Sequence, residues 1–319
     1  MWAQTLTGPG SFSLVEVPDA GFDSDNIDQV LIEVLAGGIC GSDLPLFRGI
    51  TPLNRASLVG APGYPLHEVV GRVARSHSGR QTPGAYVVGW APRLNGLCEK
   101  LVVSATDVLE YDAAVPPTTA VLLQPLACVL AAVAQVRDRI PLSAAVIGQG
   151  PIGILFSHVL KSLGVRRVIG VDPVDRADVA RAFGVDEVVT DCARIWAAGV
   201  ADEDRPELVV EAVGHQTDTL EDAVDALADG GRFLYFGIPD QAVYPFPIHR
   251  FQRKNATFWS GTTRDKRAAL VAASTYLTKH PQLCEIYVTN VFAVSNAQQA
   301  FELASIPAMG RLKVVLDYS

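Results

Sequence analysis

The sequence predicts an α/β protein in which a β-rich domain and a doubly wound parallel-sheet domain share one chain. Short β-favouring runs broken by Gly and Pro fill residues 1 to about 120, as expected of a barrel or sandwich. From residue 124 on, short apolar strands alternate with helical segments, which is typical of right-handed βαβ units. A glycine pattern, Gly148-Gln149-Gly150-Pro151-Ile152-Gly153, stands where the first of those strands meets its helix.

Four runs predict the strands of the β-rich part, since each is rich in β-favouring residues and bounded by turn residues. They are LIEVLAG at 31–37, VVGRVA at 69–74, AYVVGW at 85–90 and KLVVSA at 100–105. The last part of the chain predicts two more helices and two more strands. The helices are expected over 264–278 and 295–304, and the strands near 285–292 and over 312–318.

The alternating part predicts a parallel sheet that is covered by helices on both faces. Its strands are expected at 144–148, 167–172, 186–190, 207–214 and 232–237, with a possible sixth at 256–261. The helices between them are expected at 151–164, 175–184 and 217–231.

Composition excludes several classes of protein. The chain has 319 residues, 49% of them hydrophobic and 19% charged, which is ordinary for a globular protein long enough for two domains. The net charge is −8 and the basic residues form no long run, so a nucleic-acid partner is not expected. The five cysteines are scattered and form no CxxC pair, which argues against a disulfide framework or a zinc site of clustered thiolates.

The start of the chain, MWAQTLTGPGSFSLVEVPD, lacks the basic and apolar regions of a secretory signal. No stretch approaches the roughly 18 apolar residues that a membrane span needs. We therefore expect a cytoplasmic protein with no membrane partner.

The glycine pattern predicts a dinucleotide-binding turn. Gly148 would allow the tight turn, Gly150 would let the backbone approach a pyrophosphate, and Gly153 would let the helix pack on the sheet. Pro151 and Ile152 open the helix, whose free N–H groups and dipole favour phosphate binding. The alternative is a glycine-rich turn without a ligand, and the complete βαβ context argues against it.

An acidic residue stands at the spacing expected for binding the adenosine ribose. Asp172 ends the next strand, 19 residues after Gly153. Its carboxylate would accept both ribose hydroxyls and repel a 2′-phosphate, and Pro173 follows it in place of a cation, so NAD is favoured over NADP. Arg176 is expected either to pack on the adenosine or to be a solvated helix charge.

Two short motifs in the β-rich part predict a metal site. Cys40 lies in GICGSD, and the adjacent residues His67 and Glu68 lie in HEVVGRV. A thiolate, an imidazole and a carboxylate are the donors expected for a catalytic zinc with one open position. Asp43 is expected to orient His67 by accepting its second ring N–H. Taken singly, Cys40 as a small buried hydrophobe and His67 as a satisfied core histidine would be the favoured interpretations.

These motifs together resemble the zinc-dependent medium-chain alcohol and polyol dehydrogenases, including sorbitol- and glucose-dehydrogenase-like members. The resemblance implies a GroES-like catalytic domain of residues 1–123 and 264–319, and a Rossmann NAD-binding domain of residues 124–263. It covers essentially the whole chain. The motifs that carry it, in the family's order, are GICGSD, HEVVGRV, QPLA at 124–127, GQGPIG with Asp172, VVEAVG, RFLYFGIP and GRLKVVLDY.

The resemblance also implies roles for individual residues. By position, Cys40 and His67 match zinc ligands of the family, and Glu68 matches the glutamate that ligates or approaches the metal. Gln124 stands where related members carry a glutamate, so its amide oxygen would ligate zinc weakly or hold a bound water. Ser42 matches the hydroxyl that passes on the substrate proton.

The chain also departs from the family's pattern. The lobe that carries four cysteines for a structural zinc is missing, because residues 84–100 contain only Cys98, so we expect one catalytic zinc and no structural zinc. Pro45 stands where many members have a relay histidine, so the proton would leave Ser42 through water or a substrate hydroxyl. Leu66 replaces the glycine that usually precedes the His-Glu pair, and this change is expected to affect how His67 is aimed.

The activity implied is hydride transfer between NAD and a secondary alcohol or ketone of a polyol, sugar or cyclitol-like small molecule. A homo-oligomer, either a dimer or a tetramer, is also implied. Phe47, Tyr64 and Trp90 are candidates for lining the substrate cleft. Two alternatives stay open, a zinc-independent quinone or enoyl reductase of the same fold and a nicotinamide-binding protein without catalysis.

Overall fold

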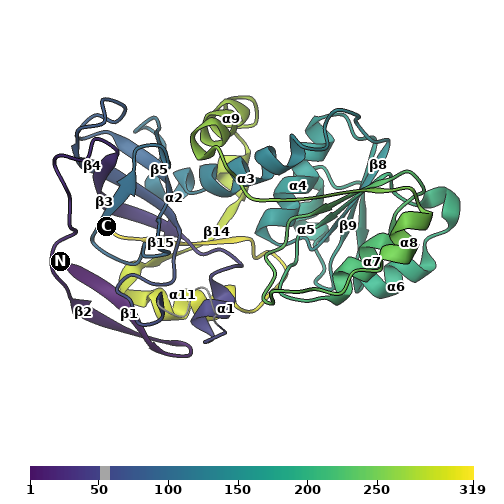
Figure 1. The fold of residues 1–319 in the computed structure, drawn as a ribbon, viewed down its shortest axis with the longest axis horizontal. Helices are drawn as coiled ribbons and strands as arrows, with labels where there is room; N and C mark the ends of the chain where they lie inside the picture. Colours follow the sequence, from purple (N-terminus) through teal and green to yellow (C-terminus); the bar gives the residue numbers. More distant parts are fainter. Residues whose placement is uncertain (51–57) are drawn as a thin grey trace. The chain divides into compact units, whose positions relative to one another are not determined.

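The computed structural model describes residues 1–50 and 58–319, and the chain forms two compact units (Figure 1). The β-rich unit contains Met1–Ala127, Arg264–Ile306 and Leu312–Ser319. The parallel-sheet unit contains Cys128–Thr263 and the short segment Pro307–Arg311. Relative to the expected boundaries, residues 124–127 join the β-rich unit and residues 307–311 join the other.

A seven-stranded sheet forms the centre of the β-rich unit. Its strand order is β14-β15-β3-β4-β5-β7. β3 pairs with β4 along one edge, and along its other edge it pairs with β15 over residues 36–38 and with β6 over residues 29–33. All pairs are antiparallel except β14 with β15. A separate hairpin is formed by β1 (Trp2–Gly8) and β2 (Ser11–Glu16). The strands of the sheet are β3 (Gln29–Gly38), β4 (Glu68–Ser76), β5 (Tyr86–Trp90), β6 (Lys100–Ser104), β7 (Val108–Glu110), β14 (Val288–Ala293) and β15 (Lys313–Asp317).

Helices and apolar cores complete this unit. The helices are α1 (Leu44–Phe47), α2 (Pro117–Ala120), α3 (Leu123–Val133, which runs on into the second unit), α9 (Lys266–Lys279), α10 (Leu283–Ile286) and α11 (Ala297–Ala304). Phe47 and Tyr64 are buried in the core beside α11. They are therefore core residues, and the prediction that they line a substrate cleft is wrong, because their rings pack among other apolar side chains.

The second unit is a six-stranded, fully parallel sheet with the order β10-β9-β8-β11-β12-β13. Counted within the unit, this order is 3-2-1-4-5-6, the doubly wound topology of dinucleotide-binding folds. It confirms the expected α/β fold class, and 256–261 does supply a sixth strand. The strands are β8 (Ser143–Ile147), β9 (Arg167–Val171), β10 (Glu187–Val189), β11 (Leu208–Glu211), β12 (Arg232–Tyr235) and β13 (Thr257–Ser260).

The helices of the parallel-sheet unit are α4 (Pro151–Ser162), α5 (Ala177–Ala180), α6 (Ala193–Gly199), α7 (Asp218–Ala226) and α8 (Ile248–Arg253). The helix expected over 175–184 is shorter than predicted, since it tightens to a 3₁₀ turn over Arg181–Phe183 and ends at the left-handed Gly184. Among residues 1–50 and 58–319, every helix is too short or too polar to cross a membrane.

Candidate functional site

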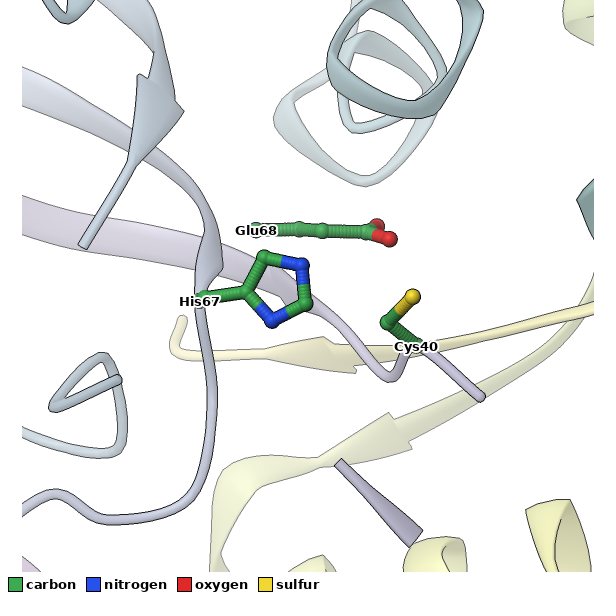
Figure 2. A group of neighbouring side chains, drawn as sticks. All are labelled: Cys40, His67 and Glu68. Carbon is green, nitrogen blue, oxygen red and sulfur yellow. The ribbon is translucent and has the colours of Figure 1, made fainter. Parts of the chain in front are cut away.

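Two adjacent antiparallel strands bring the predicted metal ligands together. Gly38, the last residue of β3, is paired with Glu68, the first residue of β4. Cys40 therefore follows one strand beside the place where His67 and Glu68 begin the other. The thiol sulfur, a ring nitrogen of His67 and a carboxylate oxygen of Glu68 all lie within 4.8 Å of one another (Figure 2).

Asp43 fixes both the histidine and the cysteine of this cluster. Its carboxylate is fully buried, accepts a hydrogen bond from Nδ1 of His67 at 2.8 Å, and accepts the backbone N–H of Cys40 at 3.1 Å. With Nδ1 committed in this way, Nε2 of His67 keeps its lone pair for another partner. Burial lowers the pKa of His67, but Asp43 and Cys40 outweigh it and hold the pKa well above its ordinary value. The negative charge of Asp43 beside this imidazole therefore favours a cation bound at the cluster.

Glu68 is held by a residue that sequence reasoning missed. Nζ of Lys313, at the start of β15, lies 2.6 Å from Oε1 of Glu68, and both side chains are 1% exposed. Oε2 of Glu68 has no hydrogen-bond partner among the described residues. A buried carboxylate oxygen without a partner is costly unless a ligand completes it. The signal in the sequence was a single lysine inside the apolar run LKVVLDY.

Two consecutive glycines in β3 make room for this arrangement. A Cβ atom on Gly38 would lie 2.2 Å from Oε2 of Glu68, and one on Gly37 would lie 2.4 Å from Cδ2 of Leu66. Leu66 is fully buried over Gly37. The space that the missing side chain of Gly37 leaves therefore accommodates the leucine, while His67 keeps its contact with Asp43.

The other predicted residues of this site lie in the same unit. Gln124 is buried at the beginning of α3, and its N–H donates to the carbonyl of Val121 at 3.2 Å. Val121 in turn lies against Gly38, 2.5 Å from where a Cβ would be. Ser42 is half-buried in the turn between Cys40 and Asp43. The roles of Gln124 as a ligand and of Ser42 in proton transfer stay predictions.

The donors of this cluster fit a zinc ion. A thiolate, an imidazole whose Nδ1 is held by Asp43 and a carboxylate with an unpartnered oxygen are the mixture found in catalytic zinc sites. Three protein ligands leave one coordination position for water or substrate. Cys40, His67 and Glu68 are therefore the residues that could hold the metal.

The glycine pattern of the second unit has the geometry of a phosphate-binding turn. Gly148 has a φ of +87°, which favours glycine, and a Cβ on Gly153 would lie 1.7 Å from the carbonyl oxygen of Gly148. A Cβ on Gly150 would have nothing within 4 Å, so the backbone there faces open space. Pro151 begins α4 directly after Gly150, so the free N–H groups of the helix point toward that space.

Asp172 and Arg176 lie at the neighbouring strand end. One carboxylate oxygen of Asp172 accepts the N–H of Gln149 at 2.7 Å, and the other accepts the N–H of Val174 at 2.8 Å. Arg176 is 3% exposed and donates from Nη1 to the carbonyls of Ala308 and Arg311 at 2.9 and 3.0 Å. Arg176 is thus no solvated charge; its guanidinium ties the segment Pro307–Arg311 to this corner of the sheet.

Comparison with known proteins agrees with both halves of this description. Residues 26–114 match the family model of the alcohol dehydrogenase GroES-like domain, and residues 151–274 match that of the zinc-binding dehydrogenases. Together the two matches span more than half of the chain. The chain belongs to the zinc-type medium-chain dehydrogenases.

This dehydrogenase is similar along its length to several relatives. It is 23% identical to a sorbitol dehydrogenase of Halalkalibacterium halodurans, over 98% of this chain and 97% of the relative. It is 27% identical to a D-altritol 5-dehydrogenase of Agrobacterium fabrum, over 80% and 82%. Among solved structures, the alcohol dehydrogenase TADH from Thermus sp. ATN1 is similar with a TM-score of 0.82 and 25% identity, over all of both chains.

In this medium-chain dehydrogenase, the segment between β5 and β6 is short and packs on neighbouring strands. Gln4 in β1 donates its N–H to the carbonyl of Leu97 at 2.8 Å, and Ala3 bridges Cys98. The thiol of Cys98 donates to the carbonyls of Asn95 and Lys100, and burial raises its pKa to about 12. Cys98 is therefore a protonated thiol at neutral pH, which is not the form that ligates zinc.

Proposed function

We propose that the protein is an NAD-dependent dehydrogenase that interconverts a secondary alcohol and a ketone of a polyol, sugar or cyclitol-like molecule. One zinc ion would be held by Cys40, His67 and Glu68, with Gln124 as a further or water-mediated ligand. The observation that carries this proposal is the cluster of three donors within 4.8 Å, in which one buried carboxylate oxygen has no partner. Cytoplasmic location stays an expectation from the sequence, and assembly as a homo-oligomer stays an expectation from the resemblance.

When bound, zinc would supply Lewis-acid polarisation of the substrate oxygen, and the nicotinamide would supply the hydride chemistry. The chain's own residues supply orientation and charge. Asp43 holds the ring of His67 by Nδ1, so that Nε2 faces the donor cluster. Lys313 neutralises Glu68 at Oε1 and leaves Oε2 free to face the same cluster. Ser42 would accept the proton that the alcohol releases and pass it to water or to a neighbouring substrate hydroxyl.

A polyhydroxylated substrate is supported by the donor set and by the names of two relatives. A carboxylate in place of a second thiolate makes the site harder and more polar. The relatives named sorbitol dehydrogenase and D-altritol 5-dehydrogenase act, by name, on polyols. The proposed substrate class extends this to sugars and cyclitols, which present the same secondary alcohols.

Metal analysis combined with a substrate screen tests the proposal directly. We expect about one zinc per chain, and NAD reduction with stereochemically defined polyols that chelation abolishes and added zinc restores. Activity that persists without any metal would point instead to a zinc-independent reductase. NADH binding with no turnover on polyols, sugars or ketones would point to a non-catalytic binding protein. Either outcome would refute the proposed mechanism.

The preference for NAD is proposed from the surroundings of Asp172. Its carboxylate would repel a 2′-phosphate, and the nearest cation, Arg176, is committed to two backbone carbonyls. We expect the double variant Asp172→Ser with Pro173→Arg to lower the NAD:NADP ratio of kcat/KM by about 100-fold. The variant would lose the charge-assisted hydrogen bonds to the ribose hydroxyls of NAD, and it would replace the repulsion of the 2′-phosphate of NADP by attraction. Steady-state kinetics with both cofactors measure it.

Asp175, three residues after Asp172, provides a matched control for this change in cofactor preference. Asp175 is exposed two residues before α5, and its carboxylate accepts the N–H of Ala177 at 2.9 Å. Asp175→Ser removes this acidic charge, keeps an oxygen acceptor and leaves the proposed ribose site untouched. Its cofactor ratio should stay within about threefold of that of the wild type, because exposed charges are screened. An unchanged ratio in the double variant would refute the assignment of Asp172.

A further inference from the structure

A buried glutamate ends the strand beside the first strand of the parallel sheet. Glu211 is the last residue of β11 and is fully buried. β11 pairs with β8, whose other neighbour is β9, so the strand order reverses here. Ligands of doubly wound sheets bind outside the carboxyl ends of the strands at this reversal. Burial raises the pKa of Glu211 despite the hydrogen bonds that its carboxylate accepts.

Glu211 holds the loops that follow two strands. Its Oε1 accepts the N–H groups of Val213 and Gly214, at 3.1 and 3.0 Å, and the hydroxyl of Thr219 at 3.0 Å. Its backbone carbonyl accepts the N–H groups of Phe236 and Gly237, at 2.9 and 3.1 Å. One residue thus fixes the loop after β11 with its side chain and the loop after β12 with its main chain.

The two loops pack closely against each other. A Cβ on Gly237 would lie 2.3 Å from the nitrogen of Gly214 and 2.4 Å from Oε2 of Glu211. Gly214 has a φ of +65°, and the N–H of His215 donates to the carbonyl of Ile238 at 2.9 Å. The carboxylate of Glu211 therefore lies at the junction of both loops.

The loop after β11 also rests on the glycine turn. A Cβ on Gly148 would lie 2.7 Å from Cγ2 of Val213, and the N–H of Ala212 donates to the carbonyl of Ile147 at 2.9 Å. Val213 and Ile238 nevertheless keep 40% and 41% of their surface exposed at this edge. Val213 is thus presented beside the turn that would bind the pyrophosphate, and Ile238 lies against Gly214 in the loop that Val213 begins.

We propose that Glu211 is a positioning residue that shapes the nicotinamide half of the cofactor site by fixing the loops that carry Val213 and Ile238. This inference rests on the proposed function. The pyrophosphate would lie at the Gly148 turn and the adenosine ribose at Asp172, on the β9 side of β8. The other half of the dinucleotide therefore extends to the β11 and β12 side, where Glu211 holds the two loops.

The test compares the whole cofactor with ADP-ribose, which is the same molecule without its nicotinamide ring. Glu211→Met removes the acceptor for Val213, Gly214 and Thr219, so the dissociation constant for NADH should rise about tenfold or more. ADP-ribose, which lacks the nicotinamide, should bind within about threefold of wild type. Glu211→Gln keeps an oxygen acceptor and should restore NADH binding to within about threefold of wild type. Titration calorimetry measures all three proteins.

The control is Glu207→Met, at the residue that immediately precedes β11, where the carboxylate lies 3.8 Å from Arg139. It should bind both ligands as the wild type does. Equal losses of NADH and ADP-ribose in Glu211→Met, or unchanged NADH binding, would overturn the proposal. If Glu211→Met fails to fold, Thr219→Val carries the same test with a smaller selective loss for NADH. A wild-type chain that bound neither ligand would refute the proposed function itself.

Discussion

Replacing Cys40 by serine or His67 by alanine is expected to remove the zinc and lower kcat/KM at least about 100-fold. Lewis-acid polarisation is worth several kcal/mol, and each 1.36 kcal/mol is a factor of ten in rate. The cluster contains only three charged or soft donors within 4.8 Å among the described residues, so losing one leaves too few for tight binding. Zinc content and steady-state rates should fall together. NADH binding should stay within about threefold of wild type, because the glycine turn belongs to the other unit.

Cys284→Ser is the matched control for this experiment. Cys284 is a half-buried free thiol of the same unit, in α10 and outside the donor cluster. This variant should retain its zinc and its rate. If Cys40→Ser or His67→Ala turned over substrate at the wild-type rate, the metal mechanism would be wrong.

The second large effect concerns Lys313. Replacing it by methionine leaves the fully buried Glu68 carboxylate without its counter-ion, which typically destabilises a protein by about 3–5 kcal/mol. In a unit of this size we expect the thermal midpoint of the zinc-free protein to fall by about 10 °C. Calorimetry of the chelator-treated variant and wild type gives the shift.

Two further variants make this result interpretable. Lys266 pairs with Asp107 at the same 2.6 Å in the same unit, but its side chain is 29% exposed. Lys266→Met should therefore cost no more than about 1 kcal/mol. Lys313→Met combined with Glu68→Leu should recover most of the lost stability, since apolar replacement of a buried pair is often neutral. Equal shifts in the two single variants, or no recovery in the double variant, would contradict this explanation.

Much of the fold was predictable from local pattern. Each of the four β-favouring runs forms a strand, with at most one residue outside it, because alternating burial and bounding turns are properties of neighbouring residues. The glycine pattern predicted the turn from β8 into α4 for the same reason, since Gly148 needs a positive φ and Gly153 a close approach. The stop at Gly184 was predictable, but the short α5 was not, because local pattern does not reveal that the helix tightens to a 3₁₀ turn after Ala180.

The candidate site was predictable only in part. Cys40, His67 and Glu68 were recognised from motif and donor chemistry, and strand pairing brings them together. Lys313 was missed because it lies 245 residues from Glu68 along the chain, and no local pattern connects them. The partners of Arg176 were missed for the same reason, since the carbonyls of Ala308 and Arg311 come from a distant segment.

The position of β15 has a consequence for how the molecule is made. At translation rates of about 5–20 residues per second, roughly 10 to 50 s separate the synthesis of Glu68 from that of Lys313, its partner 245 residues later. During that interval the ribosome produces the whole of Cys128–Thr263, which supplies all six strands of the parallel sheet. The nascent chain can therefore complete its parallel sheet before Lys313, the counter-ion of Glu68 in the donor cluster, has been synthesised.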